Sequence, residues 1–226
     1  MSNVIKTSGL TKIYGKKSSA FTALNNINLS IIQGESVAII GKSGSGKSTL
    51  MHLLALLDSP TNGKIVINNV DSHKLSVKKM DVLRNENFGF VFQQFFLNPH
   101  ETVLDNVVLP LKIAGVSRSE RHKRGLEVLD AVDLSEKSKD KAVNLSGGQK
   151  QRVCIARALI NNPTVIFADK PTGNLDSITG QKVEDLLFKL NKDKNITLII
   201  VTHDDELASR CRRQIHIKDG NLEKEI

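Results

Sequence analysis

Residues 36–48 read Ser-Val-Ala-Ile-Ile-Gly-Lys-Ser-Gly-Ser-Gly-Lys-Ser. The apolar run Ser36–Ile40 predicts a buried strand, and residues 41–48 fit the phosphate-loop pattern G-x-x-x-x-G-K-[ST]. An apolar-periodic segment, Lys47–Leu57, then predicts a helix. A strand, a glycine-rich loop and a helix in this order predict a P-loop NTPase core of the α/β class.

Phosphate chemistry explains why this loop is rich in glycine. Without a Cβ in the way, the backbone N–H groups turn toward one point, and the following helix adds partial positive charge beneath the phosphates. We expect Lys47 to reach the β- and γ-phosphates of ATP and the Ser48 hydroxyl to ligate Mg²⁺. The alternative, a merely flexible turn, is disfavoured by the flanking strand and helix. The residues expected to contact the nucleotide are Gly41, Lys42, Ser43, Gly44, Ser45, Gly46, Lys47, Ser48 and Thr49.

Short apolar runs predict further strands at Phe88–Phe92, Thr164–Ala168 and Ile196–Val201. Because these runs are apolar throughout, they suit a parallel sheet that is covered on both faces. The stretch up to Ile32 is also β-rich, with a turn at Gly15–Ser19. Alternation of such strands with helical segments is typical of an α/β fold.

The middle of the chain has a helical pattern instead. It predicts helices over Val103–Ala114, Arg118–Val132 and Gly147–Ile160, with Ser117 and Glu120 as a capping box and a charged loop at Glu136–Lys141. We therefore expect one domain over residues 1–226. Residues 1–93 and 162–226 would form the nucleotide-binding core, and residues 94–161 a helical lobe inserted between its strands.

Composition narrows the classes of partner. Lysine and arginine outnumber aspartate and glutamate by 32 to 24, and the resulting charge of +8 favours a nucleotide, a nucleic acid or an anionic membrane face. A membrane-spanning helix needs about 20 apolar residues, and the runs here are far shorter. No signal peptide is evident at the N-terminus. Two cysteines, Cys154 and Cys211, are too few for a disulfide framework, and a reducing cytosol is the simplest location.

Two further features suggest phosphate chemistry. Asp169 ends an apolar run, where an acid is expected to hold Mg²⁺ through its water shell; alternatively it only caps the next turn. Residues 145–149, Leu-Ser-Gly-Gly-Gln, precede a predicted helix, with Ser146 as N-cap and two glycines leaving the first N–H groups bare. This predicts a second anion-binding helix terminus, which a single nucleotide does not readily explain.

With this motif the chain resembles the ATPase subunits of ABC transporters over essentially its whole length. The resemblance implies a RecA-like core with an N-terminal antiparallel β region and an inserted α-helical subdomain. It also implies that two ATPase domains, here two copies of the chain, pair head to tail. Each ATP would lie between the phosphate loop of one copy and the signature motif of the other. The signature residues are Leu145, Ser146, Gly147, Gly148 and Gln149.

Other positions match the family pattern in the expected order. Tyr14 resembles the aromatic residue that stacks on adenine, and Gln93 the glutamine that contacts Mg²⁺ and the attacking water. Asp176 lies in a segment that resembles the loop coupling the two sites of the dimer, and His203 resembles the histidine that contacts the γ-phosphate. The implied metal contacts are Ser48, Gln93 and Asp169. The simpler alternatives are a strand-edge tyrosine, a surface glutamine and a structural histidine.

The chain departs from the family at Lys170, where the pattern places the glutamate that polarises the hydrolytic water. A lysine with an ordinary pKa of about 10.4 carries a proton and has no acceptor lone pair at neutral pH. We therefore expect this copy to bind ATP but to hydrolyse it very slowly. Either an engineered change that traps a nucleotide-bound state or a naturally degenerate subunit accounts for Lys170, and the otherwise intact motifs favour the first.

Residues 90–111 and Pro171–Asp176 resemble the group of macrolide-exporter, lipoprotein-release and antimicrobial-peptide-resistance ATPases. This implies a separately encoded transmembrane permease, driven by ATP-dependent dimerisation, and a position on the inner face of the cytoplasmic membrane. The permease would serve export, lipoprotein release or mechanical transmission. Phe95, Phe96 and Leu97 fit either a groove for a coupling helix or packing of the lobe onto the core.

Two other functions compete with this interpretation. With Lys170, the chain also fits a catalytically degenerate, nucleotide-gated regulatory partner of a second, active ATPase. Its charge of +8 gives some weight to a nucleic-acid-associated ABC ATPase. However, the sequence has no long heptad insertion, no cysteine cluster for zinc and no second ATPase cassette, so we expect no nucleic-acid partner.

Overall fold

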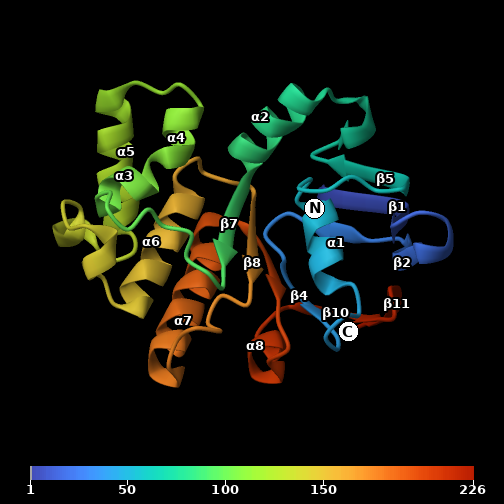
Figure 1. Cartoon of the computed structure of the whole chain (residues 1–226). Helices are drawn as coiled ribbons and strands as arrows, with labels where there is room; N and C mark the ends of the chain where they lie inside the picture. Colours follow the sequence, from blue (N-terminus) through green and yellow to red (C-terminus); the bar gives the residue numbers. More distant parts are fainter. Residues whose placement is uncertain (1) are drawn as a thin grey trace.

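A six-stranded sheet forms the centre of the molecule, in the order β11-β10-β4-β9-β8-β7 (Figure 1). The computed structural model describes residues 2–226. Neighbouring strands are parallel except at the edge, where β11 runs antiparallel to β10, which confirms the predicted parallel sheet. The strands are β4 (Ser36–Ile40), β7 (Phe88–Phe92), β8 (Val165–Asp169), β9 (Thr197–Val201), β10 (Arg213–Lys218) and β11 (Asn221–Glu225).

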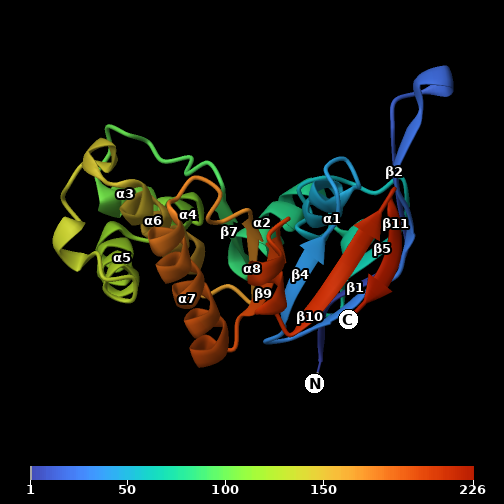
Figure 2. The same ribbon diagram turned by 90° about the horizontal axis from the view of Figure 1, so that it is seen from below.

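A second, antiparallel sheet occupies the N-terminal region, as the family resemblance implied. Its order is β2-β1-β5-β6, with β3 also paired to β1. The hairpin of β1 and β2 projects from the body of the molecule (Figure 2). The strands are β1 (Asn3–Tyr14), β2 (Phe21–Ile27), β3 (Ser30–Ile32), β5 (Asn62–Ile67) and β6 (Val70–Asp71).

Both faces of the central sheet are buried. On β4, Val37 and Ile39 join one apolar cluster while Ala38 and Ile40 join another, because successive side chains of a strand point to opposite faces. The first cluster includes α1 and the antiparallel sheet, and the second includes α6, α7, α8 and the helices between β7 and β8. This two-sided burial explains why β4 and β9, which lie inside the sheet and are buried at every position, consist almost entirely of apolar residues.

The four predicted helical segments are present, with α5 and α6 ending one or two residues early and two larger differences, whereas α2, α7 and α8 were not predicted. The predicted helix Lys47–Leu57 ends at Leu54, and Leu56 has a left-handed backbone with φ 54°. The helices are α1 (Lys47–Leu54), α2 (Val77–Asn87), α3 (Val103–Val107), α4 (Leu109–Ile113), α5 (Arg118–Asp130), α6 (Gly147–Leu159), α7 (Ser177–Lys194) and α8 (Asp205–Ser209).

The second of these larger differences concerns the single helix predicted over Val103–Ala114. It is split at Val108, which has ψ 1° and separates α3 from α4. Pro110 explains the break, because proline has no N–H to donate to the preceding turn and restricts the residue before it. Ser117 caps α5 as predicted, accepting from the Glu120 N–H at 3.4 Å, but Glu120 makes no return bond in the described part of the chain.

Four 3₁₀ turns complete the structure. One of them overlaps the start of the segment Glu136–Lys141, which we predicted as a loop. The turns are η1 (Lys17–Ser19), η2 (Ser72–Lys74), η3 (Ser135–Lys137) and η4 (Ala142–Asn144). Within residues 2–226, no helix combines the length and the apolar character that a transmembrane span requires.

Candidate functional site

The phosphate-loop residues connect β4 to α1. Gly46 is the N-cap of α1 with φ 106°, and no side chain caps this helix end. The first N–H groups of α1 are therefore available to an anion. Glycine is required here, because a Cβ on Gly46 would lie 2.6 Å from the carbonyl oxygen of Ala23, and one on Gly41 would collide with the carbonyl oxygen of Ile217.

A cavity of about 630 Å³ opens over this loop. Most of the residues predicted to bind nucleotide come together in it, including two that lie far away in the sequence, Lys170 and His203. The predicted residues that line it are Tyr14, Gly41, Lys42, Ser43, Gly44, Gly46, Lys47, Ser48, Thr49, Lys170 and His203. Ser45 does not line this cavity: its side chain is buried, and its backbone oxygen accepts from the Gly220 N–H.

Lys47 is almost enclosed, with 8% of the residue exposed. Its ammonium donates a hydrogen bond of 2.7 Å to the carbonyl oxygen of Lys42. Burial lowers the pKa of Lys47, and the nearby positive charge of Lys170 lowers it further, while Asp169 opposes both effects. An ammonium has three donors, so Lys47 keeps donors free for a phosphate in the cavity.

Asp169 ends β8 close to this ammonium. Burial raises the pKa of its carboxyl, and the charges of Lys170, His52 and Lys47 oppose that rise. Its Oδ1 is enclosed and has no hydrogen-bond partner among the described residues. Because a buried carboxylate oxygen without a partner is costly, an added cation or a coordinated water would fit here.

These residues fit a magnesium–nucleotide complex. Within residues 2–226, no three histidine, cysteine or acidic side chains lie close enough to form a metal site alone. Mg²⁺ in nucleotide sites is commonly held by only one or two protein ligands together with phosphate oxygens and waters. The Ser48 hydroxyl in the cavity and the unpartnered oxygen of Asp169 supply that limited set.

The hairpin tip supplies aromatic groups. The Tyr14 hydroxyl donates to Oδ2 of Asp58 at 2.8 Å, and the ammonium of Lys12 lies 4.8 Å from the centre of the Tyr14 ring. Lys12 also pairs with Asp58 at 2.7 Å. Partial burial and the hydrogen bond to Asp58 raise the pKa of Tyr14. These contacts fix the ring, so it presents a rigid stacking surface.

Phe21 is a cavity residue that the sequence analysis missed. It pairs with Tyr14 across the β1–β2 hairpin and lines the same cavity, with 60% of the residue exposed. The turn predicted at Gly15–Ser19 could have indicated this position, because the strands on either side of a short turn pair with each other and place Phe21 opposite Tyr14. Ala23, two positions further along β2, also lines the cavity.

Lys170 follows β8 in a left-handed backbone conformation, with φ 44°. Its N–H donates to the Val201 carbonyl at 2.9 Å, and its own carbonyl accepts from the Gly173 N–H at 3.1 Å. A left-handed non-glycine residue is uncommon, and these two bonds hold it in place. The fixed backbone places Lys170 among the residues that line the same cavity as Lys47.

Gln93 lies outside this cavity. Its side-chain amide donates to Oδ1 of Asn174 at 3.2 Å, and Nδ2 of Asn174 donates to the backbone oxygen of Gln93 at 2.9 Å. The end of β7 is thus tied to the segment Asn174–Asp176. In this arrangement the Gln93 side chain does not reach the phosphate loop.

The signature residues 145–149 also lie apart from the cavity, at the start of α6. The hydroxyl of Ser146 accepts from the Gln149 N–H at 3.4 Å, and Oε1 of Gln149 accepts from the Ser146 N–H at 3.0 Å. Asp176 caps α7 beside it, accepting from the Thr179 N–H at 3.0 Å, and this bond lowers the pKa of its carboxyl. The predicted site residues therefore form two groups within one chain.

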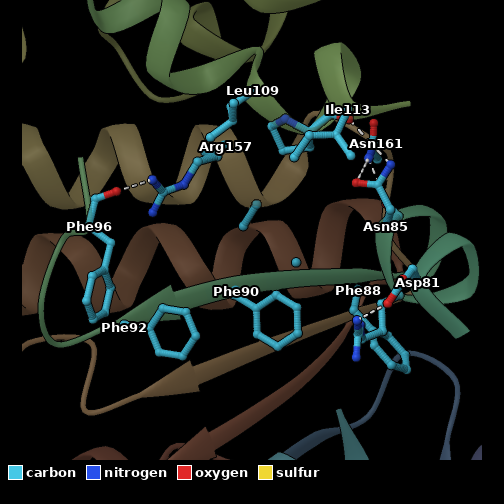
Figure 3. Close-up of a pocket in the computed structure, with 14 residues that line it drawn as sticks. Asp81, Asn85, Phe88, Phe90, Phe92, Phe96, Leu109, Ile113, Arg157 and Asn161 are labelled. Carbon is cyan, nitrogen blue, oxygen red and sulfur yellow. Dashed lines mark hydrogen bonds and ion pairs between the residues drawn. The ribbon is translucent and has the colours of Figure 1, made fainter. Parts of the chain in front are cut away.

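An apolar groove of about 570 Å³ forms a further surface feature (Figure 3). Phe92 and Phe96 lie edge to face in it, 5.6 Å apart, and Phe96 is 66% exposed. Arg157 of α6 donates to the carbonyl oxygens of Phe96 and Phe95, at 2.7 and 2.9 Å, and so holds the loop that follows β7 and carries Phe96. Leu97 is partly buried against the core, and Phe95, Phe96 and Leu97 together line a second, smaller cavity of about 230 Å³.

Comparisons with known proteins agree with the geometry. The family profile described as "ABC transporter" matches residues 24–173. The chain is 47% identical to the uncharacterized ABC transporter ATP-binding protein MJ0796 of Methanocaldococcus jannaschii, over 98% of this chain and 96% of that one. It is 44% identical to the lipoprotein-releasing system ATP-binding protein LolD of Legionella pneumophila, over 98% of each. The solved dimer of MJ0796 in a post-hydrolysis state with ADP and Pi has a TM-score of 0.88, at 45% identity, and covers 98% of this chain and 97% of that one.

Proposed function

Because this chain belongs to the ABC transporter family as an ATP-binding subunit, we propose that the cavity over α1 binds ATP and that two copies close head to tail around two nucleotides. The observation that carries the proposal is the single cavity lined by the phosphate loop, Tyr14, Lys170 and His203. Its polar end is the uncapped start of α1, and its other end is the aromatic pair of Tyr14 and Phe21.

Each group has a distinct task in this proposal. The bare N–H groups of α1 and the ammonium of Lys47 bind the phosphates, and the Tyr14 ring stacks on the base. Ser48 and Asp169 are the residues that would hold Mg²⁺, which neutralises phosphate charge when it is bound. Gln93 would join them after leaving Asn174, and His203 would contact the γ-phosphate.

The separation of the two residue groups supports a dimer. The signature residues lie at the start of α6 and do not line the cavity over the phosphate loop, so a second copy would complete each site. We propose that residues 94–161 form the lobe that carries this motif and that Asp176 couples the two sites. Light scattering with and without ATP tests this, and a particle that stays monomeric with ATP contradicts it.

Hydrolysis is the step that Lys170 impairs. Family members hydrolyse ATP, but an ammonium at this position provides no lone pair to accept a proton from water. We expect Lys170→Glu to raise the rate of phosphate release by about 100-fold or more, as a general base contributes that much. Lys170→Gln is the matched control and should stay slow. Equal rates for the original chain and Lys170→Glu would contradict the proposal.

A permease subunit is the expected mechanical partner. The groove with Phe92 and Phe96 is open and apolar, and its loop is held by Arg157, so it suits a short amphipathic helix of a membrane protein. Docking there would place the chain on the inner face of the cytoplasmic membrane. Lys170 also favours a second role, that of a nucleotide-gated regulatory subunit, which would raise the ATPase rate of an active partner without hydrolysing ATP itself.

A further inference from the structure

Three lysines, Lys42, Lys47 and Lys170, line the cavity over the phosphate loop. The charge of Lys170 acts on Lys47 and on the nearby carboxylate of Asp169. No aspartate or glutamate is among the residues that line the cavity. The carboxylate of Asp169 thus faces the ammonium groups of Lys47 and Lys170, and the charges of these three side chains sum to a net positive value even without the exposed Lys42.

The position of Lys170 is fixed by its backbone. The hydrogen bond from its N–H to Val201 ties it to the end of β9, and its carbonyl closes a turn with Gly173. Because the backbone N–H and carbonyl of Lys170 are both hydrogen-bonded, only rotation of its side chain can change the distance between the ammonium and the cavity. Lys170 is half-buried, so its charge is only partly screened by solvent.

This balance has opposite consequences for a metal cation and for a free triphosphate. A dication that approaches Asp169 meets two positive charges at short range, which weakens its binding. A triphosphate without a metal meets the same two charges and gains from both. With a glutamate at position 170, two carboxylates would face one ammonium, and the order of preference would reverse.

We propose that Lys170 acts as a resident cation at the γ-phosphate position, so that this chain binds nucleoside triphosphate with little need for Mg²⁺. The inference rests on the proposal that the cavity binds ATP. It goes further than slow hydrolysis, because it concerns the bound state and not the reaction. In this proposal the ammonium of Lys170 supplies the positive charge that Mg²⁺ would otherwise supply at the γ-phosphate.

The test is the dissociation constant of a fluorescent ATP analogue, measured in excess Mg²⁺ and in excess EDTA. For the original chain we expect a change of less than about threefold between the two conditions, and for Lys170→Glu a loss of about tenfold or more in EDTA. Lys170→Arg should behave like the original chain, because it keeps the charge. Lys170→Gln should fall between them.

A matched control removes the same charge elsewhere. Lys64 on β5 is exposed and lies outside the cavity, so Lys64→Glu should keep the metal-independent binding of the original chain. A tenfold loss of affinity in EDTA for the original chain would overturn the inference. If the original chain bound no ATP in either condition, the proposed function itself would fail, and the two failures are therefore distinguishable.

Discussion

Gln93 and Asn174 are joined by two hydrogen bonds, one of 3.2 Å from the Gln93 side-chain amide and one of 2.9 Å to its backbone oxygen, and the Gln93 side chain lies outside the nucleotide cavity. Entry of Gln93 into the site requires that its amide leave Asn174. If Gln93 enters the site as proposed, loss of the side-chain bond would oppose nucleotide binding by a small amount, since a net hydrogen bond contributes about 0.5–1.5 kcal/mol.

Removal of that bond should strengthen nucleotide binding. In a Lys170→Glu background, where we expect Mg²⁺ to matter, Asn174→Ala should tighten ATP binding by at most about tenfold. Isothermal titration measures the change. In a Gln93→Ala background the same substitution should have no effect, since the group that it releases is gone. An equal gain in both backgrounds would contradict this role of the pair.

Phe21 should contribute to binding of the base together with Tyr14. Phe21→Ala should weaken ATP affinity by about 1–3 kcal/mol, because one aromatic surface is removed from the base. The melting temperature should change little, as the ring is largely exposed. Val82→Ala is the matched control, since Val82 is an exposed apolar residue that does not line the cavity. An unchanged affinity in Phe21→Ala would show that only Tyr14 contacts the base.

Asp58 should make stability depend on pH in the acid range. Burial alone raises the pKa of its carboxyl, but hydrogen bonds from Lys12 and Tyr14 outweigh this and hold the pKa below the ordinary value of 3.8. Because the folded-state pKa is the lower one, the carboxylate stabilises the fold at neutral pH, and this contribution is lost as the pH falls below 3.8.

Thermal unfolding of the original chain and Asp58→Asn at several pH values tests this. The original chain should melt at the higher temperature near neutral pH, with a gap that stays constant down to about pH 5 and shrinks below about pH 4. A difference in melting temperature that is the same at every pH would mean that Asp58→Asn destabilises the fold by altered packing and not by loss of the negative charge. Lys12→Met should show the same trend, because it removes the cation that Asp58 faces.

The groove should bind the permease through Phe96. Phe96→Glu should abolish co-purification with the membrane subunit, because a carboxylate is costly to bury in an apolar contact. ATP affinity should stay unchanged, since Phe96 does not line the nucleotide cavity. Ile178→Glu is the control, as Ile178 is similarly exposed on α7 and lies outside the groove. Loss of ATP binding in Phe96→Glu would indicate a packing role instead.

Local sequence predicted the elements around the phosphate loop well. The strands Ser36–Ile40 and Phe88–Phe92 were predicted with their exact bounds, because each is an apolar run set off by polar residues. Helix α2 was not expected, since none of its residues is buried and its sequence lacks an apolar stripe. Its place depends on contacts with the rest of the fold.

In the candidate site, too, the features set by local sequence were predictable and those set by long-range contacts were not. The phosphate loop could be read from the sequence because its chemistry is local, whereas the place of Phe21 depends on the register of a hairpin. The partner of Gln93 lies 81 residues further along the chain, and no local pattern indicates that contact. Asp176 is the N-cap of α7, a structural role that we did not predict and that stands beside the coupling role implied by the family resemblance.

Helix α6 connects two features of the molecule: the loop beside the apolar groove, which Arg157 holds, and the signature motif at the start of the helix. Near the C-terminal end of α6, the guanidinium of Arg157 binds the carbonyl oxygens of Phe95 and Phe96 beside the apolar groove; at the other end the helix starts at Gly147, after its N-cap Ser146. These points are about 15 Å apart along a continuous helix, at 1.5 Å per residue. A helix resists bending over such a span, so α6 moves as a rigid body. A displacement of the loop that carries Phe96 would therefore also displace the signature motif.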